Sequence, residues 1–152
     1  MRNAIDYPSS GEVGMDLLKK QATKPLKKRI MVVDDDKEFL EELKETLLLS
    51  GYEVKEVRDS TKATGLAAEI KPDLILLDLR MQGMTGFEVA NKLRAIPETK
   101  KIPILVMSGY FTEEKDGSLL SFFNMQNYLQ KPFNPLDVIY QIERLLKEAR
   151  EQ

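Results

Sequence analysis

The sequence predicts an α/β fold in which a doubly wound, five-stranded parallel sheet lies between two layers of helices, a three-layer α/β/α arrangement. Short apolar runs at residues 30–33, 74–77 and 102–107 are typical of strands buried on both faces. Segments with apolar residues at helical spacing alternate with the strands, which indicates five strand–helix units. This alternation favours a parallel sheet, because parallel strands need long crossover connections.

The first unit pairs the run at 30–33 with a helix. Asp35 or Asp36 can cap this helix, because a short side-chain oxygen accepts the free backbone N–H groups of the first turn. Gly51 is expected to end it. Its apolar side consists of five residues at helical spacing: Phe39, Leu40, Leu43, Leu47 and Leu48.

The second unit is less regular. Residues 52–57 alternate like a strand with one polar face. The helix expected over 60–70 is weak because Gly65 interrupts it, and Lys71 and Pro72 end it.

The third unit follows the run at 74–77 with a capping box. In such a box, side chains like those of Thr85 and Glu88 satisfy the free N–H groups at a helix start. The helix that begins here carries five apolar residues: Phe87, Val89, Ala90, Leu93 and Ile96.

The last two units complete the pattern. Pro103 lies at the start of the fourth strand, where its missing N–H matters least. Four apolar residues mark the helix that follows: Leu119, Leu120, Phe122 and Phe123. The fifth strand is short, at 128–129, and Asn134 with Pro135 is a typical helix start. The last helix is lined by Ile139, Ile142, Leu145 and Leu146.

Residues 1–28 differ in charge from the rest of the chain. They carry six basic and three acidic side chains, a net charge of +3, whereas the whole chain has a net charge of −2. Prolines, glycines and serines are frequent in them, so we expect a mostly irregular extension with one possible short helix over 13–20. Residues 29–152 form the predicted domain. The basic stretch 24–29 is interpreted as a solvated linker rather than a nucleic-acid contact.

The composition excludes several kinds of chemistry. The chain has 152 residues without cysteine or histidine. Disulfides, zinc–thiolate sites, cysteine nucleophiles and histidine-based triads are therefore ruled out. No signal peptide and no apolar stretch of the ~20 residues that span a bilayer is visible. We expect a cytoplasmic protein that binds neither membranes nor nucleic acid.

Polar residues collect where the predicted strands end. In a doubly wound sheet, the loops at the carboxyl ends of the strands build the functional site. The residues at these ends are acids, one hydroxyl and one amine: Asp34, Asp35, Asp36, Asp78, Ser108 and Lys131. Asp36 by itself is best explained as a helix cap.

The grouping of the acids predicts a cation between them. Crowded carboxylates repel one another and raise each other's pKa unless a cation neutralises them. Oxygen ligands without histidine or cysteine suit Mg²⁺. A magnesium site beside a carboxylate, a hydroxyl and a lysine is typical of phosphoryl transfer, with Asp78 as the nucleophile, Ser108 as a hydrogen-bond donor and Lys131 neutralising phosphoryl oxygens.

Residues 29–150 resemble the receiver domain of two-component response regulators. The residues that carry the resemblance keep the family's spacing: the acidic pair Asp34 and Asp35, the acceptor Asp78, Ser108 thirty residues later, and Lys131 followed by Pro132 and Phe133. Tyr128, three residues before the lysine, matches the aromatic switch position. The resemblance implies the flavodoxin-like form of the predicted fold.

The resemblance also implies a phosphoacceptor site. Asp78 would accept a phosphoryl group from a sensor histidine kinase or a histidine phosphotransfer protein. Mg²⁺ would be held by Asp78, Asp35 and the backbone carbonyl of Arg80, and by Asp34 through a water molecule.

Three further residues have implied roles in the phosphorylated state. Ser108 would move to the phosphoryl group, and Tyr128 would turn into the space that Ser108 leaves. Lys131 would pair with a phosphoryl oxygen, and the peptide bond that follows it is commonly cis in receivers.

The chain departs from the family pattern at several positions. Gln82 stands where many receivers have proline, and residues 124–127 replace a common Gly-Ala turn. Asn124 or Asn127 could supply the left-handed conformation of that turn. We expect these departures to alter the surface formed by the last two helices and the fifth strand, where partners would bind. At least one of the phenylalanines at 122 and 123 is expected in the core.

Two large side chains flank the expected path of hydrolytic water. Arg80 lies two residues after the acceptor, and Tyr110 lies two residues after Ser108. We expect both side chains to screen Asp78 and to slow autodephosphorylation.

We interpret the chain as a stand-alone receiver that is not a turnover enzyme. Few residues follow the last helix, so its output would be contact with a downstream protein, as a monomer or as a weak dimer through the last two helices and the fifth strand. A magnesium-dependent phosphohydrolase with an aspartyl nucleophile is the less favoured alternative, because it needs an acid at position 80, where arginine stands. A docking module that works without phosphorylation is the other alternative.

Overall fold

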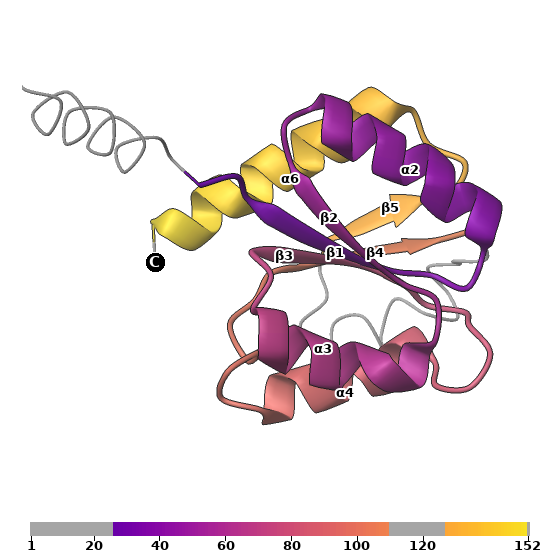
Figure 1. The fold of residues 1–152 in the computed structure, drawn as a ribbon, viewed down its shortest axis with the longest axis vertical. Helices are drawn as coiled ribbons and strands as arrows, with labels where there is room; N and C mark the ends of the chain where they lie inside the picture. Colours follow the sequence, from indigo (N-terminus) through magenta and orange to yellow (C-terminus); the bar gives the residue numbers. More distant parts are fainter. Residues whose placement is uncertain (1–25, 110–126, 152) are drawn as a thin grey trace, which may run out of the picture.

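A computed structural model describes residues 26–109 and 127–151 of the chain. Figure 1 shows a parallel sheet with helices on both of its faces. The strands are β1 (Arg29–Val33), β2 (Glu53–Val57), β3 (Leu74–Asp78), β4 (Ile104–Ser108) and β5 (Tyr128–Gln130). The helices are α2 (Lys37–Leu49), α3 (Ala63–Ile70), α4 (Gly86–Ala95) and α6 (Pro135–Arg150), with a 3₁₀ turn η1 (Ser60–Lys62).

The order of the strands confirms the predicted doubly wound sheet. All neighbours are parallel, in the order β2-β1-β3-β4-β5. From β1 the chain passes first to one side, to β2, and then returns to the other side, to β3. The switch point between β1 and β3 opens a crevice at the carboxyl ends of these strands, which is where doubly wound sheets bind their ligands.

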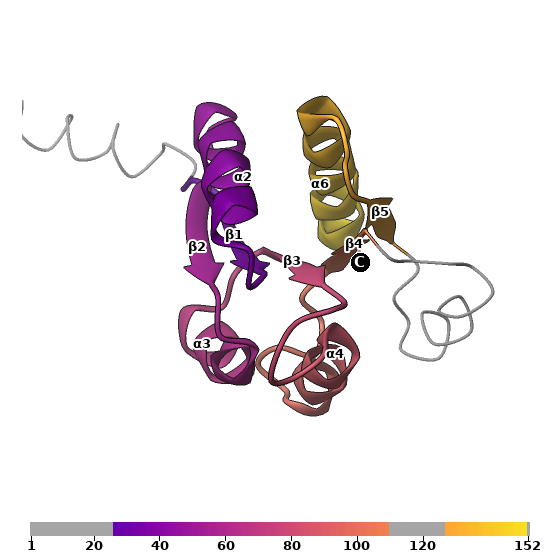
Figure 2. The same ribbon diagram turned by 90° about the vertical axis from the view of Figure 1, so that its right-hand side faces the viewer.

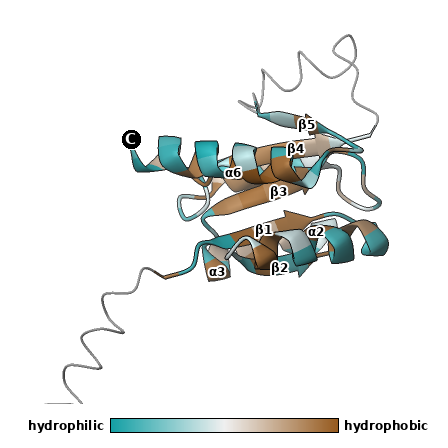
Figure 3. Cartoon of the chain, turned by 90° about the horizontal axis from the view of Figure 1, so that it is seen from above, coloured by the Kyte–Doolittle hydropathy of each residue, from teal (hydrophilic) through white to brown (hydrophobic). Residues whose placement is uncertain are grey.

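Helices cover the two faces of the sheet in pairs. In Figures 1 and 2, α2 and α6 lie on one face, and α3 and α4 lie on the other. Because side chains alternate along a strand, β1 sends Ile30 and Val32 to the first layer and Met31 and Val33 to the second. Between Arg29 at the start of β1 and Asp78 at the end of β3, these two central strands are apolar, as the brown colour in Figure 3 shows. The predicted buried runs are confirmed, except that Ile102 and Pro103 are half-buried and precede β4.

The predicted helix starts are confirmed by their capping bonds. The Asp36 side chain accepts from a first-turn backbone N–H of α2, and Thr85 does the same for α4. Asn134 caps α6, whose first residue is Pro135. Of the two candidates for the first cap, the structure selects Asp36, which leaves Asp35 available to the site.

Two predicted details are wrong. Gly65 does not interrupt its helix; the break comes earlier, because the Asp59 side chain accepts from the N–H of Thr61 and closes the 3₁₀ turn η1 before α3 begins. Leu48 is 49% exposed, since α2 buries Leu47 and its neighbour in sequence points away. The left-handed residue expected at Asn124 or Asn127 stays a prediction, because the turn that contains them lies largely outside the described residues.

Several predictions fall outside the described residues. They are the short helix over 13–20, the helix marked by Leu119 to Phe123, and the environments of Tyr110 and Asn124. None of the helices in the described part of the chain has the length and apolar character needed to cross a membrane.

Candidate functional site

The register of β1 and β3 brings two buried acids together. Val33 pairs with Leu77, so the residues that follow them, Asp34 and Asp78, lie side by side at the carboxyl edge of the sheet. Asp34 is fully buried and Asp78 is 6% exposed. With the exposed Asp35, they form a cluster in which one carboxylate oxygen from each residue lies within 4.8 Å of the others. These three acids, predicted from strand ends alone, therefore come together in space.

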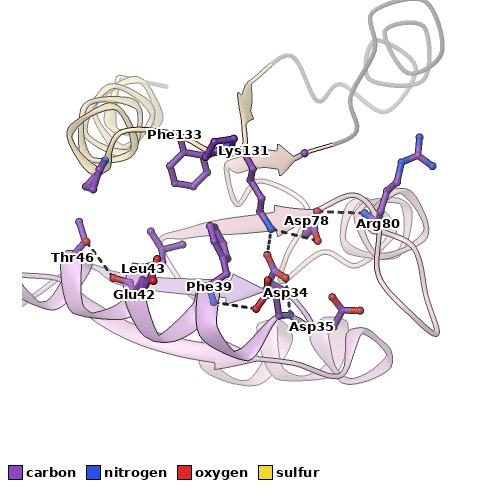
Figure 4. A pocket seen from close by; sticks show the side chains of 14 residues that line it. Asp34, Asp35, Phe39, Glu42, Leu43, Thr46, Asp78, Arg80, Lys131 and Phe133 are labelled. Carbon is purple, nitrogen blue, oxygen red and sulfur yellow. Dashed lines mark hydrogen bonds and ion pairs between the residues drawn. The ribbon is translucent and has the colours of Figure 1, made fainter.

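Lys131 enters the acidic cluster from the end of β5. Its ammonium nitrogen lies 2.5 Å from Asp34 Oδ2 and 3.7 Å from Asp78 Oδ2, as Figure 4 shows. The Lys131 N–H donates to the Ser108 carbonyl, which places the lysine beside β4, and the peptide bond to Pro132 is cis. The predicted lysine is thus at the site, 97 residues from Asp34 in the chain.

An aromatic ring also holds the lysine. The ammonium lies 3.8 Å from the centre of the Phe39 ring, a distance at which a cation is attracted to the ring face. Phe39 packs edge-on against Phe133, with ring centres 5.7 Å apart. The sequence predicted Phe39 only as part of the apolar side of its helix, because nothing in the spacing distinguishes a ring that contacts the core from one that contacts a lysine.

The site holds more negative charge than one lysine balances. Burial and the nearby charge of Asp34 raise the pKa of Asp78 to about 6, and the charge of Lys131 opposes this only in part. Burial also raises the pKa of Asp34, against the hydrogen bond from Lys131. Bringing a divalent cation to the acids would therefore relieve their repulsion.

Backbone N–H groups hold one further carboxylate oxygen of each acid. The Asp36 N–H donates to Asp34 Oδ1 at 3.0 Å, and the Arg80 N–H donates to Asp78 Oδ1 at 3.4 Å. The Gln82 N–H donates to Asp35 Oδ2 at 3.1 Å. The Arg80 side chain is exposed and extends away from the acids in Figure 4.

Ser108 and Tyr128 are linked at the end of β4. Ser108 is 1% exposed, and its carbonyl accepts a hydrogen bond of 3.1 Å from the Tyr128 hydroxyl. The Tyr128 ring packs against the apolar residues on the α3 and α4 face. The two predicted switch residues are therefore in contact through backbone and hydroxyl.

A cavity of about 590 Å³ extends from the acids between α2 and the start of α6. The acids and Lys131 line one end of it, and Phe39, Leu43, Phe133 and Pro135 form the apolar part of its lining, together with Glu42 and Thr46 of α2. Sequence reasoning missed this extension, because its two walls lie far apart in the chain.

Sequence reasoning also missed the role of Gly86. A Cβ at this position would lie 2.2 Å from the carbonyl oxygen of Asp78 and 2.7 Å from the Cα of Leu79. A glycine therefore allows the start of α4 to pack directly behind the acidic cluster. The signal was present as a glycine immediately after the helix cap Thr85, but only the folded chain shows what it approaches.

The family model for the response regulator receiver domain matches residues 30–143. The chain belongs to this family. Receivers are signalling domains, and they typically bind Mg²⁺ at an acidic pocket of the kind formed here by Asp34, Asp35 and Asp78.

Relatives with similar sequences are regulators that bind DNA. The receiver is 31% identical over 123 residues to the DNA-binding dual master transcriptional regulator RpaA of Synechocystis, covering 80% of this chain and 50% of the relative. It is 33% identical over 122 residues to the DNA-binding response regulator MtrA of Mycobacterium tuberculosis, covering 80% and 52%. The chain spans about half the length of these curated relatives.

Solved structures of single receivers match over nearly their whole length. The CheY-like response regulator receiver domain protein of Methanospirillum hungatei is 26% identical, with a TM-score of 0.77 over 83% of this chain and 98% of that one. Chemotaxis protein CheY4 of Vibrio cholerae is 29% identical, with a TM-score of 0.74 over 79% and 99%. The predicted fold class is thereby confirmed.

Proposed function

We propose that this receiver accepts a phosphoryl group on Asp78 from a phosphohistidine of a sensor histidine kinase or a histidine phosphotransfer protein. The observation that carries the proposal is the buried Asp78 carboxylate, which lies within a cluster of three acids and 3.7 Å from the Lys131 ammonium. This arrangement combines a nucleophile, a cation site and a fixed positive charge.

The acids also supply the ligands for a magnesium ion. Carboxylate oxygens of Asp35 and Asp78 and the backbone carbonyl of Arg80 would hold Mg²⁺, with Asp34 acting through a water molecule. Hard oxygen donors of this kind suit Mg²⁺. The ion would neutralise phosphoryl oxygens during transfer.

In the transfer step, a carboxylate oxygen of Asp78 attacks the phosphorus and forms a P–O bond. The P–N bond to the partner's histidine breaks, and its electron pair leaves with the imidazole nitrogen. Lys131 would turn from Asp34 toward a phosphoryl oxygen. The histidine must come from the partner, because this chain contains none.

Ser108 and Tyr128 would then report the phosphorylated state. The Ser108 hydroxyl would donate to the phosphoryl group, and the Tyr128 ring would follow into the vacated space. The hydrogen bond from Tyr128 to the Ser108 carbonyl supports this coupling, because a movement of β4 at Ser108 changes the partner of the tyrosine hydroxyl.

The apolar cavity beside the acids is the proposed docking surface for the phosphohistidine protein. Phe39, Leu43 and Phe133 line it next to Lys131, so a helix that seats there would present a histidine to Asp78. The output is proposed to be contact with a downstream protein. The stand-alone arrangement, the weak dimer and the division at residue 28 stay predictions.

Labelling with radioactive acetyl phosphate tests the proposal. We expect Mg²⁺-dependent labelling of the parent and none of Asp78→Asn, with Asp73→Asn, a half-buried acid outside the cluster, as the matched control. Labelling that survives Asp78→Asn would reject the assignment. Steady turnover of a phosphoester would favour the phosphohydrolase alternative, and partner binding unaffected by Asp78→Asn would favour the constitutive docking module.

A further inference from the structure

The loop between β3 and α4 is fastened to two other loops through Gln82. The Gln82 N–H donates to Asp35 Oδ2 at 3.1 Å, and the Gln82 carbonyl accepts from the Ser60 hydroxyl at 3.1 Å. The same hydroxyl accepts from the Met84 N–H at 2.9 Å. The loop is therefore held on both sides of Gln82, by the segment after β1 and by the 3₁₀ turn after β2.

The bonds to Ser60 are shielded from water. Ser60 is 1% exposed, and its hydroxyl uses its donor and an acceptor site within the same loop. Gly83, between the two bonded residues, has a φ of +82°, and a Cβ there would lie 3.4 Å from the serine hydroxyl. Because the loop packs closely against Ser60 and bonds to it twice, the Gln82 backbone is held in one position.

Asp35, by contrast, is an exposed acid on a loop. An exposed carboxylate samples several side-chain rotamers unless a partner selects one. The Gln82 N–H engages one of its oxygens and leaves the other oxygen for a further ligand. Its carboxylate is thereby kept within 4.8 Å of those of Asp34 and Asp78.

We propose that the backbone N–H of Gln82, braced by the Ser60 hydroxyl, is a positioning group that holds Asp35 ready to bind a divalent cation. This inference rests on the proposed magnesium site. Groups that hydrogen-bond a metal-ligating carboxylate fix its orientation, and their loss costs metal affinity.

The proposal depends on the backbone of residue 82 and not on its side chain. The Gln82 side chain is exposed, whereas the bond to Asp35 comes from the main chain. Any residue with a backbone N–H can supply this bond, and proline cannot. Gln82→Ala and Gln82→Pro are therefore a matched pair that separates the two contributions.

The test measures Mg²⁺ binding to the full chain by isothermal titration calorimetry and by amide chemical shifts. We expect the parent and Gln82→Ala to bind Mg²⁺ with dissociation constants within about twofold of each other. Gln82→Pro is expected to bind about tenfold more weakly, the lower end of the loss seen when such a partner is removed. Ser60→Ala should weaken binding in the same direction. Equal affinity of Gln82→Pro and Gln82→Ala, at matched thermal stability, overturns the proposal.

A second measurement decides the matter even if Gln82→Pro does not fold. Hydrogen exchange of the Gln82 amide is compared in the parent and in Asp35→Ala, both without metal. Exchange at least fivefold faster in Asp35→Ala supports the hydrogen bond, and unchanged exchange overturns it. A parent that binds no Mg²⁺ rejects the proposed metal site together with this inference, whereas a parent that binds it equally well without the Gln82 N–H rejects this inference alone.

Discussion

The Lys131 ammonium lies closer to Asp34 than to the proposed phosphoacceptor Asp78, with N–O distances of 2.5 Å and 3.7 Å. Asp34 is fully buried, whereas the Lys131 side chain is 18% exposed. In this state the charge of the lysine mainly balances that of Asp34, the more buried of the two acids. The negative charge of Asp78 is balanced only in part. Lys131 therefore has a structural role in the unphosphorylated state besides its proposed contact with a phosphoryl oxygen.

Replacing Lys131 by methionine is expected to destabilise the metal-free protein at pH 7 by about 2 kcal/mol or more, because it leaves buried acids without their cation. Urea unfolding in EDTA measures the loss, and Mg²⁺ should recover part of it. The control is Lys28→Met, since Lys28 makes an exposed ion pair with Asp73 and should change stability by about 1 kcal/mol or less. Equal effects of the two substitutions would contradict the prediction.

Because of Asp78, the free energy of unfolding of the metal-free protein should decrease as the pH rises. The pKa of Asp78 is about 6 in the folded, metal-free protein against an ordinary value of 3.8, so the folded state binds the proton more tightly than the unfolded state. Its unfavourable contribution develops between about pH 4 and pH 6 and reaches about 3 kcal/mol above that range.

The substitution Asp78→Asn isolates this effect. In EDTA we expect the variant to be more stable than the parent at pH 7, with the gain shrinking toward zero as the pH approaches 4. Urea unfolding of both proteins across this range checks it. A gain that does not change with pH would show that Asp78 does not titrate as stated.

The contact between Phe39 and Lys131 should influence phosphorylation. Phe39→Leu keeps an apolar side chain and removes the ring face, which is worth about 0.5–2 kcal/mol to a nearby cation. We expect labelling by acetyl phosphate to slow severalfold in this variant and to recover in Phe39→Tyr. Leu48→Ala, on the exposed side of the same helix, is the control. The prediction fails if Phe39→Leu is labelled at the parent's rate.

Gly86 and Gly65 should respond in opposite ways to alanine. At Gly86 a Cβ would lie 2.2 Å from the Asp78 carbonyl oxygen, so Gly86→Ala must displace α4 or β3 and should cost several kcal/mol, on the order of an overpacked core. At Gly65, inside α3, nothing lies within 4 Å of the added Cβ, and alanine should stabilise by about 0.5–1 kcal/mol. Thermal unfolding distinguishes the two. Similar melting temperatures for both variants would argue against the close packing behind Asp78.

Screening of Asp78 by Arg80 and Tyr110 stays a prediction. Arg80 extends away from the acids here, and Tyr110 lies outside the described residues. We expect the double variant Arg80→Ala/Tyr110→Ala to lose its phosphoryl group several times faster than the parent, because water reaches the acyl phosphate more easily. The decay of labelled protein after removal of the donor measures this. Decay at the parent's rate would exclude screening.

The sequence by itself determined the alternation of strands and helices, the helix caps at Asp36, Thr85 and Asn134, and the group of residues at the strand ends. These features depend on neighbours in the chain: apolar runs, helical spacing and short side chains that bond the next turn. The assignment failed at Leu48 and Gly65 because local spacing does not show where a helix leaves the core or where a loop bond closes an earlier turn.

Only the tertiary structure decided how the site residues share their partners. Three contacts show this: the bond from Lys131 to Asp34, the Phe39 ring beneath the Lys131 ammonium, and the Gln82 N–H on Asp35. Each joins residues that lie between 47 and 97 positions apart in the chain. Their geometry follows from strand register and helix packing, which sequence spacing does not encode. The residues of the site can thus be identified from the sequence, whereas the way their charges balance one another depends on the folded arrangement of the sheet and helices.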